Sequence, residues 1–258
     1  MLKKKAMSSE RASEVKRKGH ADAHEFAECL GIGRDYTSDP RAKKDVIDLQ
    51  GNTYSVKSGE KKWQIFLYSK NRFKQDYNFQ TMNGLGDIFV ACIESFPESR
   101  AEYLKNKDIY KKKLEKSMIA LCEKLNDTRL LKAFIDKSMF NSGEVNFLVI
   151  KEEKQFHVFW NKDVVEILSK NYKVENSKAR GKNQFNNQKV IFKVSDQTHG
   201  EIEMRNDSDI HYREVKFWLG KRLTFNLLRG NINIKKEIPQ RRIILYGDAI
   251  KKLKKIIW

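Results

Sequence analysis

The residues with the clearest chemical potential lie in the stretch Lys44–Lys57, KDVIDLQGNTYSVK. It reads as two short runs with alternating apolar residues, joined at Gln50–Asn52. A Gly-Asn dipeptide between such runs is typical of a β-hairpin, because both residues accept the positive φ that tight turns need. Folding brings an acid, Asp45, toward Lys57 from twelve positions away. On so basic a chain, this arrangement indicates metal-dependent cleavage of phosphodiester bonds.

The chemistry of that cleavage defines which groups to expect. It needs a metal to neutralise charge on the phosphate and a means of activating water. Mg²⁺ takes oxygen ligands and keeps several waters, so one carboxylate and a backbone carbonyl can hold it. Alternation along a strand places Ser55 and Lys57 on one face. The Val56 side chain then points into the core, while its carbonyl remains available to a metal.

The turn of the hairpin decides which acid joins Ser55 and Lys57. A two-residue Gly51-Asn52 loop pairs position 48 with 55 and brings Asp48 to that face. A three-residue Gln50–Asn52 loop pairs 45 with 57 and brings Asp45 instead. Turn chemistry alone leaves both alternatives open.

Asp45-Val-Ile-Asp48 followed by Ser55-Val-Lys57 resembles the active-site hairpin of the PD-(D/E)-X-K nuclease superfamily, to which most type II restriction endonucleases belong. A preceding helix that carries an acid, here Glu25, is similar to many members. The resemblance implies that Asp45 is a metal ligand, that Glu25 is an auxiliary ligand and that Lys57 orients or activates the attacking water. It favours Asp45 over Asp48.

The stretch departs from the family pattern at two positions. Lys44 stands where the family name has Pro, a common variation. Ser55 stands where Asp or Glu is expected, so the resemblance leaves a ligand to be supplied by Glu25 or Glu60. The resemblance covers roughly residues 18–73. It implies an α/β (α+β) fold with a central mixed β-sheet flanked by helices, a restriction-endonuclease-like core and a helical insert.

The elements that must position these residues follow from periodicity and breakers. A helix is expected over 8–30, capped by Ser8 or Ser9 and ended at Gly31. The length of the run 60–73 favours a helix, with a strand through 64–68 as the alternative. Further expectations are two lysine-rich helices over 99–124 and 127–140, a hairpin over 144–160, a helix beginning at 163, strands at 190–194 and 201–204, and a helix over 208–228.

A second stretch competes for the site. Glu214-Val-Lys216 is a literal E-X-K sequence with Asp207 and Asp209 upstream. The expected helix points residues i and i+2 in different directions, and the spacing after Asp209 leaves no room for a hairpin. The hairpin at Lys44–Lys57 is therefore preferred.

Sequence-specific DNA recognition needs Arg, Asn, Gln or Lys on an element that enters a groove. The polar segment 176–189 is rich in these residues, although an ordinary surface loop has the same composition. The candidate DNA-binding residues are Arg180, Lys182, Asn183, Gln184, Asn187, Gln188, Arg205 and Asn206. The lysines of the C-terminal tail are expected to contact phosphates, which position a protein without specifying sequence.

The overall charge supports a polyanionic partner. The chain has 52 Lys and Arg against 34 Asp and Glu, a net charge of +18. Each cation near a phosphate gains by releasing condensed counterions, although a solvated lysine-rich surface gives the same totals. Together with the charge, the resemblance implies a Mg²⁺-dependent, sequence-specific endonuclease for double-stranded DNA, and the resemblance alone implies that it acts as a homodimer. The alternatives are a non-catalytic nucleic-acid-binding protein and a structure-specific repair or recombination nuclease.

The remaining totals exclude other classes of protein. Three scattered cysteines support neither a disulfide framework nor a zinc site. No apolar run reaches the roughly 20 residues of a membrane helix, so no membrane association and a cytoplasmic location are expected. One nuclease domain is expected over 1–258: residues 8–73 begin the catalytic core, 99–140 form the helical insert, and 171–258 form the DNA-recognition and basic C-terminal part.

Overall fold

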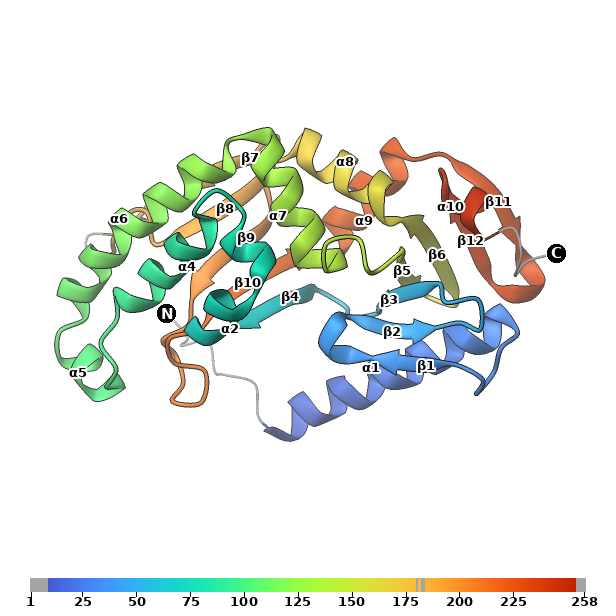
Figure 1. Cartoon of the computed structure of the whole chain (residues 1–258), viewed down its shortest axis with the longest axis horizontal. Helices are drawn as coiled ribbons and strands as arrows, with labels where there is room; N and C mark the ends of the chain where they lie inside the picture. The colour runs from blue at the N-terminus through green and yellow to red at the C-terminus, as the bar shows by residue number, and fades with distance from the viewer. Residues whose placement is uncertain (1–8, 180, 182–183, 254–258) are drawn as a thin grey trace. The chain divides into compact units, whose positions relative to one another are not determined.

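The computed structural model describes residues 9–179, 181 and 184–253, which divide into two compact units (Figure 1). The described residues of the first unit come from the segments Met1–Trp63, Ile135–Leu168 and Lys221–Trp258. Those of the second unit come from Gln64–Phe134 and Ser169–Gly220. The expected recognition part, 171–258, is therefore shared between the units, and a single nuclease domain over the whole chain stays a prediction.

The first unit is built on a seven-stranded mixed sheet. Strands β3 and β5 pair in parallel, as do β6 and β12, and the other neighbours are antiparallel. This confirms a mixed α/β fold with a large mixed sheet flanked by helices. In spatial order the strands are β1 (Thr37–Asp39), β2 (Lys44–Ile47), β3 (Thr53–Lys57), β5 (Phe147–Glu152), β6 (Gln155–Trp160), β12 (Ile243–Tyr246) and β11 (Ile234–Ile238).

Helix α1 (Ser9–Leu30) covers one face of this sheet (Figure 1). Its Phe26 ring lies 5.2 Å from the Tyr54 ring of β3 and 5.3 Å from the Phe156 ring of β6, measured between centroids. Helix α10 (Ala249–Lys252) contributes Ala249 to the same core. Because residues in a strand alternate between faces, Asp45, Ser55 and Lys57 lie on the opposite face.

That opposite face carries helix α9 (Lys221–Asn231). Phe225 of α9 lies 4.6 Å from the buried His157 ring of β6, measured between centroids. Ser55 lies on this face too, because it pairs with Leu148 of β5, which in turn pairs with Phe159 of β6. Most of α8 (Asn161–Asn171) also belongs to the first unit. The hairpin residues therefore share a face with α9 and not with α1.

The second unit contains a five-stranded sheet and most of the remaining helices. Its core is a cluster of stacked and edge-on rings that includes Phe66, Phe73, Phe89 and Phe134. The strands, in spatial order, are β4 (Lys62–Tyr68), β10 (Val215–Gly220), β9 (Gln197–Met204), β8 (Lys189–Val194) and β7 (Lys173–Asn176).

The predicted helical segment 99–140 is confirmed. It forms α5 (Arg100–Lys105), α6 (Lys107–Leu125) and α7 (Thr128–Phe140), and α7 begins in the second unit. The Asp127 carboxylate caps α7 by accepting hydrogen bonds from the amides of Arg129 and Leu130 at 2.8 and 3.1 Å. Shorter helices precede this segment: α2 (Lys70–Gln75), α3 (Tyr77–Gln80) and α4 (Leu85–Glu94).

Two predicted helices are wrong. Over 60–73 the chain forms β4, which confirms the alternative of a strand through 64–68, and then α2; Trp63 and Ile65 are buried at alternate positions of β4. Over 208–228 it forms β10 and then α9, with β10 lying between β4 and β9 in the sheet. Strand β10 lies inside its sheet and reads as a nearly continuous apolar run, which periodicity cannot separate from a buried helix.

The other expected elements agree with the structure within a few residues. Helix α1 is confirmed over the described residues, while its expected cap at Ser8 lies outside them. Strands β5 and β6 form the expected hairpin, and β8 and β9 take the expected strand positions. Among the described residues, no helix is long and apolar enough to cross a membrane.

Candidate functional site

The register of the β2–β3 hairpin places Asp45 opposite Ser55. Val46 pairs with Tyr54 and Ile47 with Thr53, so the turn contains Leu49–Gly51 between Asp48 and Asn52. Both predicted registers are therefore wrong: the loop has the three residues of the second alternative, but it begins one residue earlier. The Asp48 carboxylate accepts hydrogen bonds from the amides of Gln50 and Asn52, each at 2.9 Å, and so starts the turn earlier than the Gly-Asn signal predicts.

Asp45 is held by the strand opposite it. Its Oδ2 accepts a 2.7 Å hydrogen bond from the Val56 amide and a 3.3 Å hydrogen bond from Ser55 Oγ. The paired ladder ends at Val46 and Tyr54, so the carboxylate meets the amide just beyond the last backbone pair. Among the described residues, no group donates a hydrogen bond to Asp45 Oδ1. One carboxylate oxygen is therefore available to a ligand.

Lys57 lies two residues after Ser55 and on the same face. Its side chain is half-buried at the end of β3, in register with Ile150 of β5. Within the part of the chain that the structure describes, no carboxylate forms an ion pair with it. The ammonium group is therefore available to a phosphate or a water.

Asp48 is committed to the hairpin itself. Its Oδ2 accepts hydrogen bonds from Asn52 Nδ2 at 2.9 Å and from the Tyr54 hydroxyl at 2.8 Å, on the face that α1 covers. Burial, with the nearby Asp48 charge, raises the pKa of Tyr54 far above its ordinary value. Of the two acids that the sequence left open, only Asp45 shares a face with Ser55 and Lys57.

Glu25 is not brought to this group. It projects from α1 on the other side of the sheet, where it forms ion pairs with Lys151 and, at 2.6 Å, with Arg242. Asp22, which is 4% exposed, contacts Lys151 at 2.5 Å. Burial alone would raise the pKa of Glu25, but the hydrogen bonds from Lys151 and Arg242 lower it below its ordinary value. The resemblance implied that Glu25 is an auxiliary metal ligand. In the structure it belongs instead to an ion-pair network on the other face of the sheet.

Most residues of that network, namely Asp22, Lys151 and Arg242, were not predicted as site residues. Asp22 and Glu25 are three residues apart and so share a helix face, a spacing that is readable from sequence. Lys151 and Arg242 reach them from β5 and from the start of β12, more than a hundred residues away, and no local pattern points to them. Glu60, the other acid considered as a ligand, is exposed and lies 4.0 Å from Lys18.

The oxygen donors of the hairpin suit a hard divalent ion. Asp45 Oδ1, the Ser55 hydroxyl and the Val56 carbonyl come from adjacent positions of β2 and β3, and Mg²⁺ accepts such oxygens while retaining several waters. In the described segments, no three or more His, Cys, Asp or Glu side chains gather closely enough to hold a metal. A metal here would therefore depend on a single carboxylate of the hairpin.

Several of the candidate DNA-binding residues make contacts within the second unit. Asn187 donates a 2.8 Å hydrogen bond to Glu115, and Gln188 one of 2.9 Å to the Lys111 carbonyl of α6. The side-chain amide of Asn206 donates to the Tyr103 hydroxyl at 2.8 Å, and Arg205 forms an ion pair with Asp207 at 2.7 Å. The backbone amide of Gln184 donates to the Gly181 carbonyl at 3.1 Å. Arg180, Lys182 and Asn183 lie outside the described residues.

The competing E-X-K sequence does not gather acids. Glu214 accepts a 2.8 Å hydrogen bond from His211, whereas Lys216 lies 3.8 Å from Glu203. Upstream, Asp207 pairs with Arg205 and Asp209 with Arg100. Each of these charges has a different partner, so the segment presents no converging set of ligands.

Comparison with known proteins adds nothing to this geometry: no family model matches the chain, and neither curated proteins nor solved structures gave a significant match.

Proposed function

We propose that this protein is a metal-dependent nuclease whose active centre is the β2–β3 hairpin. One observation carries the proposal: the Asp45 carboxylate lies across from Ser55, on the face that also presents a half-buried Lys57 with no ion-pair partner among the described residues. An anionic oxygen ligand beside a free ammonium group matches the needs of phosphodiester hydrolysis, in which a metal and a cation share the charge of the phosphate.

Each residue has a role that follows from its contacts. Asp45 Oδ1 and the Val56 carbonyl would hold Mg²⁺, which supplies charge neutralisation at the phosphate when bound. The Ser55 hydroxyl and the Val56 amide keep the carboxylate oriented. Lys57 would hold the attacking water by hydrogen bonding and stabilise negative charge as it develops on that water.

The net charge of +18 supports a nucleic-acid substrate, and the resemblance of the hairpin to PD-(D/E)-X-K nucleases supports double-stranded DNA. We propose a type II restriction endonuclease that cuts a short specific site in the cytoplasm, as a homodimer whose two-fold symmetry matches a palindrome. A structure-specific repair nuclease would share this chemistry and differ in substrate.

A second candidate has one observation in its favour. Ser55 supplies no carboxylate, and Glu25 lies on the other face of the sheet, so the hairpin brings one acid where the family pattern has two. A non-catalytic nucleic-acid-binding protein would fit that incomplete ligand set. The experiment that follows separates the two functions.

The test is cleavage of supercoiled plasmid and of viral genomic DNA with Mg²⁺, comparing the wild type with Asp45→Asn and Lys57→Ala. Both variants should lose at least about 100-fold in rate, because a metal ligand and a water-orienting cation each contribute at that scale. Lys154→Ala and Lys235→Ala, which alter exposed charges of the first unit, are the matched controls and should cut normally.

The pattern of products identifies the kind of nuclease. Discrete fragments from genomic DNA support a site-specific enzyme, whereas preferential cutting of branched or flapped oligonucleotides supports the repair alternative. Binding without cleavage by the wild type supports the non-catalytic protein. Cleavage that persists undiminished in both Asp45→Asn and Lys57→Ala would remove the hairpin as the active centre.

A further inference from the structure

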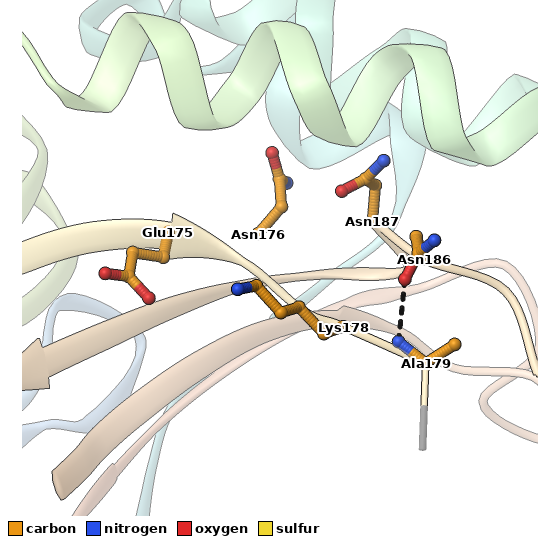
Figure 2. Close-up of a pocket in the computed structure, with 6 residues that line it drawn as sticks. All are labelled: Glu175, Asn176, Lys178, Ala179, Asn186 and Asn187. Carbon is orange, nitrogen blue, oxygen red and sulfur yellow. Dashed lines mark hydrogen bonds between the residues drawn. The ribbon is translucent and has the colours of Figure 1, made fainter. Parts of the chain in front are cut away.

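An open groove of about 720 Å³ lies in the second unit (Figure 2). The end of β7 and the β7–β8 loop line it. Five of its six lining residues carry a polar or charged side chain: Glu175, Asn176, Lys178, Asn186 and Asn187, with Ala179 as the sixth. Figure 2 shows the Asn176 and Asn187 side chains directed toward the helix above the loop. The volume is sufficient for a nucleotide-sized group.

Hydrogen bonds to α6 fix the walls of this groove. Asn176 Nδ2 donates to the Met118 carbonyl at 2.9 Å, and Asn187 Nδ2 donates to Glu115 at 2.8 Å. Asn186 Oδ1 accepts a 2.8 Å hydrogen bond from the Ala179 amide across the loop (Figure 2). These contacts hold the described ends of the loop, 176–179 and 184–188, in place before any ligand arrives, which lowers the ordering cost of binding.

The same contacts leave specific polar atoms unused. With their Nδ2 groups engaged, Asn176 and Asn187 present Oδ1 as acceptors, while Asn186, whose Oδ1 is engaged, presents Nδ2 as a donor. No other group among the described residues bonds to these three atoms. The Asn186 Nδ2 donor, held in place by the contact at its Oδ1, can donate to an acceptor on the edge of a nucleobase.

One lysine lines the groove, and others lie on α6 beside the residues that hold the loop. Lys178 is exposed, and Lys112 and Lys116 of α6 are exposed next to the positions that hold the loop. Lys111 lies over the Phe185 ring of the loop, 5.7 Å from its centroid. No carboxylate forms an ion pair with any of these four lysines in the described segments. Glu175 inside the groove is neutralised by Lys173 and Lys193 at 2.7 and 2.9 Å.

We propose that this groove is a nucleic-acid binding site, in which the lysines of α6 and Lys178 contact the phosphodiester backbone and Asn186 contacts a base edge. The proposal deepens the proposed function and rests on it for the choice of DNA as the strand. It gives the helical segment 107–125 a role in binding. It also assigns Asn187 and Gln188, expected to contact DNA, to holding the loop on α6.

The phosphate contacts can be tested without cleavage. Fluorescence anisotropy in EDTA would measure binding of a labelled DNA duplex, a single DNA strand and an RNA strand over a series of salt concentrations. The double variant Lys116→Ala/Lys178→Ala should bind roughly tenfold more weakly, and the slope of log affinity against log salt should fall by about 2. The double variant Lys154→Ala/Lys235→Ala removes the same charge from exposed positions of the first unit and should keep the wild-type slope.

The base contact has its own variant. Asn186→Asp keeps the oxygen that accepts from the Ala179 amide and replaces the free donor by an anionic oxygen, so the loop should remain folded while binding weakens. Asn83→Asp makes the same charge change at another exposed position of the second unit and should bind as the wild type does. Among the DNA duplex, the single DNA strand and the RNA strand, the one whose affinity falls most on the substitution Asn186→Asp is identified as the ligand.

Two results would overturn the inference. One is equal salt slopes for Lys116→Ala/Lys178→Ala and its control pair, which would place the phosphate contacts elsewhere while leaving the nuclease proposal intact. The other is a wild-type protein that binds none of the three strands. Asp45→Asn tests the two sites separately. If it loses cleavage but binds DNA as the wild type does, the hairpin is needed for cleavage and not for binding.

Discussion

The Val56 amide donates a 2.7 Å hydrogen bond to Oδ2 of Asp45, so the backbone of one hairpin strand orients the carboxylate of the other. The acid therefore has two roles in the same place: it completes the pairing of the strands and leaves its other oxygen free for a ligand. Substitutions of Asp45 should separate these roles.

Asp45→Asn keeps an oxygen that can accept from the Val56 amide, whereas Asp45→Ala leaves that half-buried amide without a partner. We expect Asp45→Ala to lower the free energy of unfolding by about 1–3 kcal/mol and Asp45→Asn to lower it by less. Both should abolish cleavage. Urea denaturation followed by circular dichroism measures the stability difference, and equal destabilisation by the two variants would contradict a structural role for the amide contact.

Asp48→Ala should be the more damaging change to the fold. It removes the acceptor for the amides of Gln50 and Asn52 and for the Tyr54 hydroxyl. We expect a loss of about 3 kcal/mol in the free energy of unfolding, because buried donors are left unsatisfied. Tyr54→Phe removes one of these donors, so the double variant should be less destabilised than the sum of the two changes, as a double-mutant cycle would measure.

Glu25→Gln tests the network on the α1 face. Its pKa is lowered in the folded protein, so the ion pairs contribute stability above the ordinary value of 4.5 and lose it as the pH falls through the lowered pKa. At pH 7 we expect Glu25→Gln to lower the free energy of unfolding by about 1–3 kcal/mol, since Lys151 and Arg242 each lose a partner. Below pH 4.5, the free energy of unfolding should depend less steeply on pH in Glu25→Gln than in the wild type.

The same variant tests whether Glu25 is a metal ligand. Because the structure places Glu25 on the face opposite Asp45, the Mg²⁺ concentration for half-maximal cleavage should be unchanged in Glu25→Gln. A marked rise in that concentration, in a variant that is still folded, would show that the acid reaches the metal. Lys18→Gln, an exposed change on the same helix, is the control.

His157 should make stability depend on pH in a mildly acidic range. Burial lowers its pKa from 6.5 to about 4, so the folded protein keeps the ring neutral while the unfolded chain binds a proton below pH 6.5. Its stabilising effect is thus present above pH 6.5 and falls by up to about 1.4 kcal/mol for each pH unit down to the folded pKa. Denaturation at pH 7 and pH 5 should show this slope reduced in His157→Gln and retained in His20→Gln, which alters an exposed histidine.

Gly247→Ala should destabilise the first unit strongly. The residue has φ +51°, and an added Cβ would lie 2.4 Å from Asp163 Oδ2 and 2.7 Å from Ile232 Cγ2. Gly51 in the hairpin turn also has a positive φ, +78°, but no atom lies within 4 Å of the added Cβ. Gly51→Ala should therefore cost only the backbone penalty of about 1 kcal/mol, and Gly247→Ala clearly more, by thermal or urea denaturation.

Local patterns in the sequence were sufficient for many elements of the fold. The 99–140 helices, the β5–β6 hairpin and helix α1 each have a strong period or a clear breaker, and they form near the expected positions. The two wrong helices, over 60–73 and 208–228, have runs of aromatic and branched residues that bury whether they pack as strand or helix. For β10, its neighbours in the sheet, and not its own period, decided the outcome.

For the candidate site, the residue types could be read from the sequence: an acid, a hydroxyl and a lysine in one hairpin, on a strongly basic chain. Which of these residues meet depends on the folded chain. The Asp48 side chain set the turn and hence the register, and the packing of α1 on one face of the sheet carried Glu25 away from Asp45. The physical reason is that residue type is local, whereas register and face depend on hydrogen bonds and burial contributed by distant parts of the chain.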